Sequence, residues 1–189
     1  LNLGVTLYHM DYKNQLVLTG QINDVGAYTR TNIANSYRTG IEIEANYKLS
    51  DKMNWNGNMT MSQNKIISHT TYIDNWDNWG QEIVDYKNTD LAFSPNLIFS
   101  SILNYKLIKT TSIDFISKYI GEQFIDNTSS KDRMLNDYLV NHLRISYKWN
   151  NNVFKTTKLT LQINNLLNNE YVSNAWVYRF ISDGRDPRE

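Results

Sequence analysis

Cysteine is absent from this 189-residue sequence, and proline occurs only twice. Without cysteine there can be no disulfide, no thiolate metal site and no cysteine nucleophile. No apolar run approaches the ~18 residues that a transmembrane helix requires. The 19 acidic and 19 basic residues cancel, and like charges do not gather into long runs. The basic patch expected of a nucleic-acid-binding protein is therefore missing.

Signals of catalysis are missing as well. The sequence has no P-loop, no dinucleotide-binding fingerprint and no G-x-S-x-G motif. His9, His69 and His142 lack the spacing of metal ligands. Glu42 and Glu44 lie two residues apart, but a repeating polar strand face explains them without a glycosidase pair. We predict no enzyme activity, no metal site and no cofactor.

The sequence does contain strong alternation with a period of two, most clearly in YRTGIEIEANYKLSDKMNWNGNMTM, residues 37–61. Up to Leu49, apolar and aromatic residues alternate with charged and polar ones, and a second alternation follows the turn residues 50–52. This pattern predicts an antiparallel hairpin. Tyr37 and Tyr47 share the apolar face and lie about 33 Å apart along an extended strand. If the strand is tilted by ~45°, they are separated by about 24 Å in height, which matches the spacing of the aromatic girdles of an outer-membrane barrel. A strand of a soluble β-sandwich would alternate too.

Further alternating segments predict about seven strands in all. They cover residues 1–18, 37–49, 53–62, 91–107, 113–119, 139–149 and 158–164. In the first of them the aromatic phase changes at Tyr8, so we expect a bulge near His9 or a strand end that leaves the membrane. Pro95 cannot donate to a β-ladder, which places it near an exposed strand end.

The connections between these segments alternate in length. Short turns are expected at 50–52, 108–110 and 150–156, and long loops at 19–28, 68–90, 126–136 and after 165. Outer-membrane barrels have short turns at the periplasmic end and long loops at the extracellular end. We call these the short-turn end and the long-loop end. Five aromatic residues lie close to the short turns, namely Tyr47, Trp55, Tyr105, Tyr147 and Trp149. A sandwich would not place them so regularly.

The charged residues of the alternating segments indicate which face points inward. A lysine or arginine at the bilayer midplane costs ~2–4 kcal/mol, so the charged faces are expected to face the lumen. The residues concerned are Arg38, Glu42, Glu44, Lys48, Lys106, Asp114, Lys118, Arg144 and Lys148. A lumen with this many charges must be wet or filled by polar protein. It favours a barrel larger than eight strands, although paired charges could line a small one.

Three motifs in order resemble TonB-dependent outer-membrane receptors. Residues 37–47, YRTGIEIEANY, are similar to the R-G-(I/L/V)-E-(aliphatic)-E-(A/G)-x-Y strand of this family, with Thr39 between the Arg and the Gly. Phe93-Ser94-Pro95 resembles the (F/S)-P start of a later strand. Residues 163–171, INNLLNNEY, resemble the late N-L-(F/L)-(D/N)-x-x-Y motif, with Leu167 where Phe is commoner.

The resemblance implies an all-β fold, a fragment of an antiparallel transmembrane β-barrel with about seven strands of a probable 22-stranded barrel and a plugged lumen. Residues 1–189 would be the C-terminal part of this barrel, with the plug domain and the final strand outside the chain. The function implied is uptake of a scarce ligand, such as a ferric siderophore, through the bacterial outer membrane. The partners implied are outer-membrane lipid, the ligand or chelate, and the TonB complex, which would act through a plug and N-terminal segment absent here.

Neither end of the sequence resembles a natural terminus. Leu1 opens inside an alternating segment, and residues 184–189 have the composition of a loop. We therefore expect a piece of a longer protein. Two alternatives remain at this point: a small outer-membrane barrel and a secreted, glycan-binding β-sandwich.

Aromatic and acidic residues in the long loops are the candidate ligand-binding residues. Rings with interleaved acids can stack on a sugar, a chelator or a corrin edge. The candidates are Tyr72, Asp74, Trp76, Asp77 and Trp79 in the longest loop, and Trp176, Tyr178 and Arg179 in the last loop. The alternative is that they pack the loops against their neighbours.

Overall fold

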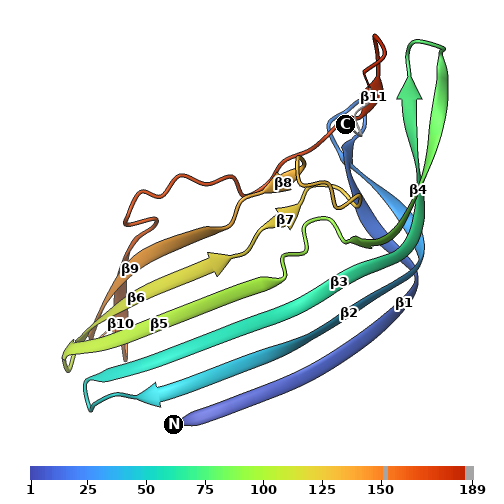
Figure 1. Ribbon diagram of the computed structural model, residues 1–189. Coiled ribbons are helices and arrows are strands. Elements are labelled where there is room, and N and C mark those ends of the chain that lie inside the picture. Colours follow the sequence, from blue (N-terminus) through green and yellow to red (C-terminus); the bar gives the residue numbers. More distant parts are fainter. Residues whose placement is uncertain (151–152, 186–189) are drawn as a thin grey trace.

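The computed structural model describes residues 1–150 and 153–185, and its regular structure is entirely β. Seven strands follow one another in a single antiparallel meander (Figure 1). They are β1 (Asn2–Ile22), β2 (Tyr28–Lys48), β3 (Met53–Asn75), β5 (Leu97–Ile108), β6 (Thr111–Ile120), β9 (Tyr138–Trp149) and β10 (Thr157–Ile163). The predicted number of strands is confirmed for the described part of the chain.

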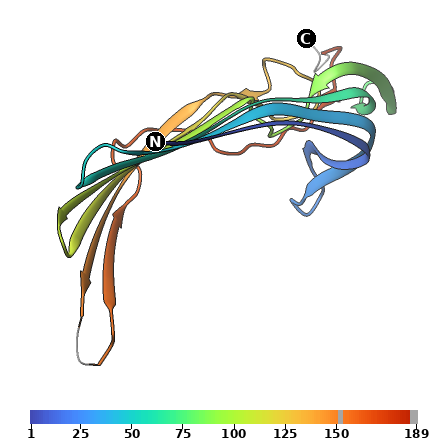
Figure 2. The same cartoon turned by 90° about the horizontal axis from the view of Figure 1, so that it is seen from below.

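Four shorter or offset strands lie toward the long-loop end. β4 (Gly80–Asp90) and β11 (Phe180–Ile181) both pair with β3, while β7 (Gln123–Phe124) and β8 (Met134–Leu135) pair with each other. The meander forms one curved, open sheet (Figure 2), in which β1 and β10 are the edges. Over the described residues the sheet is a wall that does not close on itself. These residues include no helix long and apolar enough to span a membrane.

The strand register aligns apolar residues into rows that cross the sheet. One such row contains Val5, Ile43, Met59, Phe99, Tyr119 and Leu139. Many side chains on this face are exposed, and Leu7 of the adjacent row is 74% exposed. A continuous apolar face of this kind is suited to contact lipid, as in outer-membrane barrels.

Polar and charged residues form matching rows on the opposite face. One contains Lys48, Asn54, Asn104, Asp114, Arg144 and Gln162. The predicted opposition of apolar and charged faces is thus confirmed across β2 to β10. The same register rules out the expected bulge near His9, because β1 pairs with β2 without a shift from Asn2 to Lys13. The first shift in this pairing lies between Leu18 and Ile22.

Tyr8 changes the aromatic phase of β1 without a bulge because it fills the space above a glycine. It lies directly opposite Gly40, where a Cβ would be 2.7 Å from the Tyr8 hydroxyl and 2.5 Å from the carbonyl oxygen of Met61. Trp55 covers Gly57 in the same way on the apolar face, and its Nε1 donates a hydrogen bond of 2.8 Å to Ser101 Oγ. The two glycines thus permit close aromatic cover of the strands.

The strands extend well beyond the apolar rows at the long-loop end. The expected loop at 19–28 shrinks to 23–27, and the expected loop at 68–90 is a hairpin in which β3 continues to Asn75 and β4 returns. The long-loop prediction was wrong here because backbone pairing extends these strands, while their side chains face water or neighbouring loops and therefore show no apolar period. At 23 residues β3 is about 75 Å long, roughly three times the height of an apolar band.

The start of β5 also differs from the expectation. Leu91 lies outside the strand and is buried in a small core with Val17, Ile33 and Ile66. The chain bends at Phe93, whose φ is 51°, and Pro95 lies just before β5. Residues 91–96 therefore fold against the polar face, where Ser94 Oγ lies 3.5 Å from Arg38 Nη2.

The short-turn end agrees with the prediction. β2 and β3 are joined at residues 49–52, and β5 and β6 at residues 109–110. Of the expected turn at 150–156, residues 151–152 lie outside the described part of the chain, as do residues 186–189 of the expected terminal loop.

Candidate ligand-binding region at the long-loop end

The β3–β4 hairpin and the segment after β10 meet at the long-loop end (Figure 1). This segment leaves the β9 side of the sheet, where Leu166 N donates to Asn141 O (2.7 Å), and reaches β1, where Val177 N donates to Gly20 O (2.9 Å). β11 then pairs in parallel with the end of β3, and Trp76 N donates to Ile181 O at 2.9 Å. Two long connections far apart in sequence are thereby held together.

We call the contact between the β3–β4 hairpin and residues 176–185 the junction. The candidate residues Trp76, Tyr178 and Asp74 contact one another or their neighbours within it. Trp76 stacks on Phe180 with ring centres 4.3 Å apart, and the ring of Tyr178 lies 6.5 Å from that of Trp76. The Tyr178 hydroxyl donates to Asp74 Oδ2 at 3.0 Å. This bond raises the pKa of Tyr178 because the carboxylate favours the protonated phenol. These residues join the two connections to each other.

Asp77 has a structural role at the tip of the hairpin. Its Oδ1 accepts a hydrogen bond from Asp183 N (2.8 Å), and its Oδ2 accepts one from Gly184 N (2.9 Å). Both carboxylate oxygens are therefore engaged by the backbone of the segment after β11. A ligand would have to displace these bonds to reach Asp77.

Three candidate rings remain on the surface. Trp79 is 91% exposed at the hairpin tip, where its φ is 57°. Tyr72 and Trp176 are 59% and 56% exposed. Tyr72 also borders the cavity that Tyr178 and Arg179 line. Because more than half of each side chain is exposed, all three rings are available for stacking against a ligand.

Arg179 differs from the other candidates because it is buried. Only 5% of the residue is exposed, and its Nη2 donates to the Tyr86 hydroxyl at 2.9 Å. The ring of His69 stacks on the ring of Tyr86, and the two ring centres are 5.3 Å apart. Burial lowers the pKa of His69, the carboxylate of Asp126 opposes this shift, and the Arg179 charge adds to it.

Arg179, His69 and Asp126 border a cavity of about 340 Å³ between β3, the loop that joins β7 and β8, and the segment before β11. His69 has no metal-ligand spacing and was expected to be an ordinary residue, and Thr71, Tyr86 and Asp126 belong to no recognisable sequence motif. Residues 69 and 71 fall on one face once β3 is known to continue to Asn75, but residues 68–90 show no apolar period that would have revealed this strand. The 125–133 loop could not have been brought to them, because that contact depends on the tertiary fold.

The residues predicted to face the lumen lie on the polar face of the sheet. Arg144 Nε donates to Asp114 Oδ2 at 2.8 Å, and Asn104 donates to the same carboxylate. Arg38 Nη1 donates to Asn64 Oδ1 at 3.3 Å, and Lys48 Nζ lies 2.5 Å from Asp51 Oδ1. Glu42 and Glu44 are exposed on this face. The polar face is therefore a network of paired and solvated charges.

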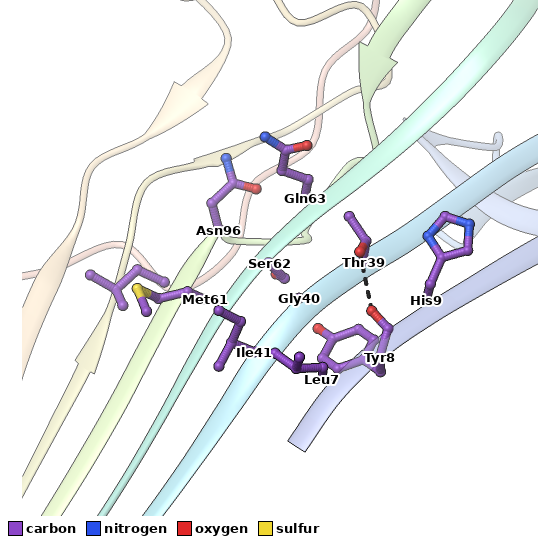
Figure 3. A pocket seen from close by; sticks show the side chains of 11 residues that line it. Leu7, Tyr8, His9, Thr39, Gly40, Ile41, Met61, Ser62, Gln63 and Asn96 are labelled. Carbon is purple, nitrogen blue, oxygen red and sulfur yellow. Dashed lines mark hydrogen bonds between the residues drawn. The ribbon is translucent and has the colours of Figure 1, made fainter. Parts of the chain in front are cut away.

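A separate hollow lies at the upper limit of the apolar face (Figure 3). Leu7, Ile41 and Met61 form its apolar part, and Gln63 and Asn96 its polar part. It marks the level at which lipid-facing residues give way to polar ones. Because it opens on the apolar side of the wall, away from the converging loops, it is not the candidate ligand site.

Comparisons with known proteins agree with this architecture. Residues 1–166 match the family model described as TonB dependent receptor-like, beta-barrel. The structure is similar to the siderophore receptor PiuA from Acinetobacter baumannii, with a TM-score of 0.64 and 20% identity over 92% of this chain and 23% of PiuA. It is also similar to the ferric-catecholate import receptor Fiu from Escherichia coli K12, with a TM-score of 0.57 and 18% identity over 91% of this chain and 22% of Fiu.

A third similar structure is the ferric yersiniabactin uptake receptor FyuA from Yersinia pestis, with a TM-score of 0.61 and 14% identity. The match covers 95% of this chain and 24% of FyuA, so the chain spans about a quarter of the length of these receptors. The search of curated proteins found no match. At these identities the similar structures show the fold, whereas the family model covers most of the sequence. The sandwich and small-barrel alternatives are set aside, and the chain belongs to the family of TonB-dependent receptor β-barrels of the Gram-negative outer membrane.

Proposed function

We propose that this chain is the C-terminal part of a receptor barrel that imports a ferric-siderophore-like chelate through the outer membrane with energy delivered by TonB. The family consists of transport receptors, which are not enzymes. The observation that carries the proposal is the junction of the β3–β4 hairpin with residues 176–185, which builds one elaborate end on a wall whose other end has short turns at residues 49–52 and 109–110.

Ligand capture belongs at this elaborate end. Trp79, Tyr72 and Trp176 present exposed rings there, and rings bind the flat, aromatic parts of a chelate by stacking. The similar structures are receptors for ferric catecholate and ferric yersiniabactin according to their descriptions. The same chemistry is our first choice for this receptor, and haem, cobalamin and oligosaccharides are the other candidates to test.

The polar face would form the wall of the lumen. Its charges are largely paired or solvated, so it can line a wet passage or contact a polar plug. Plug and TonB contacts would be made by other parts of the receptor. In this scheme the described residues supply the wall and part of the capture site.

Uptake of radiolabelled iron by cells that produce the full-length receptor tests the proposal. We expect uptake of one ferric siderophore from a panel, and loss of that uptake when tonB is deleted. A matched control strain carries the empty vector. Uptake that persists without TonB would contradict the energised mechanism, and recovery of the receptor in the soluble fraction without detergent would contradict the membrane location.

A further inference from the structure

The Arg179 guanidinium is a buried positive charge without a carboxylate partner among the residues that the structure describes. The ion pairs found there involve other cations. Its Nη2 bonds the neutral Tyr86 hydroxyl, its Cζ lies 5.8 Å from the centre of that ring, and its Nε has no hydrogen-bond partner. A buried charge of this kind is costly unless an opposite charge approaches it.

Two neighbouring side chains also have unused polar atoms. Both ring nitrogens of His69 and the hydroxyl of Thr71 are buried without a hydrogen-bond partner within the described protein. The two residues are separated by one position on β3, and both line the same 340 Å³ cavity as Arg179. Water can satisfy a hydroxyl or an imidazole, but it does not neutralise a guanidinium.

The carboxylates that border this cavity are already engaged. Asp126 Oδ2 accepts from Arg133 Nε at 2.8 Å, and its Oδ1 accepts from the Thr128 hydroxyl at 2.6 Å. Asp74 Oδ2 accepts from Tyr178, and its Oδ1 accepts from Gln81 Nε2 at 2.8 Å. All four of these carboxylate oxygens therefore already accept a hydrogen bond from a residue other than Arg179.

We propose that this cavity is an oxyanion subsite, in which a carboxylate or phosphate group pairs with Arg179 and accepts hydrogen bonds from His69 and Thr71. The subsite rests on the proposed function, since the oxyanion would be an acidic group of the imported ligand. A guanidinium presents several N–H donors in one plane and therefore suits an oxyanion better than an ammonium group does. The receptor would thus favour ligands with a free acidic group over neutral ones.

Calorimetry on the full-length receptor in detergent tests this subsite with citrate and inorganic phosphate as probes. Chloride at matched ionic strength is the reference. Wild-type protein should bind at least one probe, and Arg179→Gln should weaken this binding about tenfold or more, since a hydrogen-bonded charge is lost. Arg179→Lys should retain part of the affinity. Tighter binding of citrate indicates a carboxyl-bearing ligand, and tighter binding of phosphate a phosphate-bearing one.

Lys131→Gln is the matched control, because it removes an exposed positive charge on the loop between β7 and β8. It should leave probe affinity unchanged. Thr71→Val guards against a folding artefact, since it removes a hydroxyl without a partner and keeps the side-chain shape. We expect severalfold weaker probe binding and an unchanged melting temperature.

The subsite is refuted if wild-type receptor binds neither probe, or if Lys131→Gln weakens binding as much as Arg179→Gln. Unchanged affinity in both Arg179→Gln and Thr71→Val would refute it as well. Binding in detergent needs neither TonB nor transport. A negative result in calorimetry therefore refutes the subsite without deciding whether the receptor takes up a ferric siderophore, which the uptake experiment tests separately.

Discussion

Ile43 and Glu44 are neighbours on β2 whose side chains lie on opposite faces of the sheet. Ile43 belongs to the apolar row, so Ile43→Arg should place a charge in lipid and cost ~2–4 kcal/mol. Glu44→Gln keeps a polar side chain on the polar face and should leave assembly nearly unchanged. Heat-modifiable gel mobility of the full-length receptor reports assembly. Equal effects of the two substitutions would refute the assignment of faces.

Gly40 on β2 and Gly4 on β1 form a second matched pair. Gly40→Ala would place a Cβ 2.5 Å from the carbonyl oxygen of Met61, a backbone atom that can move only with its strand. The nearest atom to a Cβ at Gly4 is 3.9 Å away, so Gly4→Ala has room. We expect less assembled receptor in membranes for Gly40→Ala alone. Similar amounts for the two variants would contradict the close packing of Tyr8 and β3 on Gly40.

Trp76 and Trp79 should separate loop packing from ligand binding. Trp79→Ala removes an exposed ring and should weaken uptake without changing stability, whereas Trp76→Ala removes the stack on Phe180 and should loosen β11. Ligand uptake and protease sensitivity of residues 164–185 measure the two effects. Normal uptake by Trp79→Ala would show that this exposed ring does not contribute to ligand binding.

Among the structural elements, the junction between β11 and the β3–β4 hairpin should depend on pH. Burial lowers the pKa of His69 below its ordinary value of 6.5, so an opened junction takes up a proton more readily than the closed one. The closed junction then has its full stability above about pH 6.5, and this stability decreases as the pH falls toward the lowered pKa of His69. Asp126, Arg179 and Tyr86 face this ring, and Asp85 and Lys87 border the adjacent hollow.

Hydrogen exchange of the Trp76 amide, which bonds Ile181 O, measures this closure. After correction for the intrinsic chemical rate, protection should fall between about pH 7.5 and about pH 5.5. In His69→Gln the protection should be independent of pH over this interval. A wild-type protection that stays constant on acidification would show that opening does not expose His69.

The bounds of the membrane-spanning strands could be predicted from the sequence better than the bounds of their extensions. Alternation located β6, β9 and β10 to within a few residues, because one face must be apolar and the other polar there. Residues 68–90 lacked this period because both faces of the hairpin meet water or loops, and only backbone pairing defines the strands. The candidate residues Asp74, Tyr178 and Trp76 do meet, but Arg179 joins a cavity whose other walls come from distant parts of the chain.

At the scale of the whole molecule, the wall ends in two strands with an unpaired side. Among the described residues β1 pairs only with β2, and β10 only with β9. Unpaired backbone groups are costly in lipid, and receptor barrels avoid this cost by closing. These two edges therefore need hydrogen-bonding partners when the wall stands in a membrane.

The order of strands in the wall also has a consequence for the folding pathway. Each of the seven strands of the meander pairs with the strand that precedes or follows it there, so the wall can form by successive local steps with little loss of chain entropy. The bonds from Val177 to Gly20 and from Tyr178 to Asp74 join residues more than a hundred positions apart. They form only after the wall has brought these partners together. During biogenesis the contacts at the long-loop end would therefore be the last to become ordered. A nascent receptor would pass through a stage in which the wall is complete but these long connections are not yet joined.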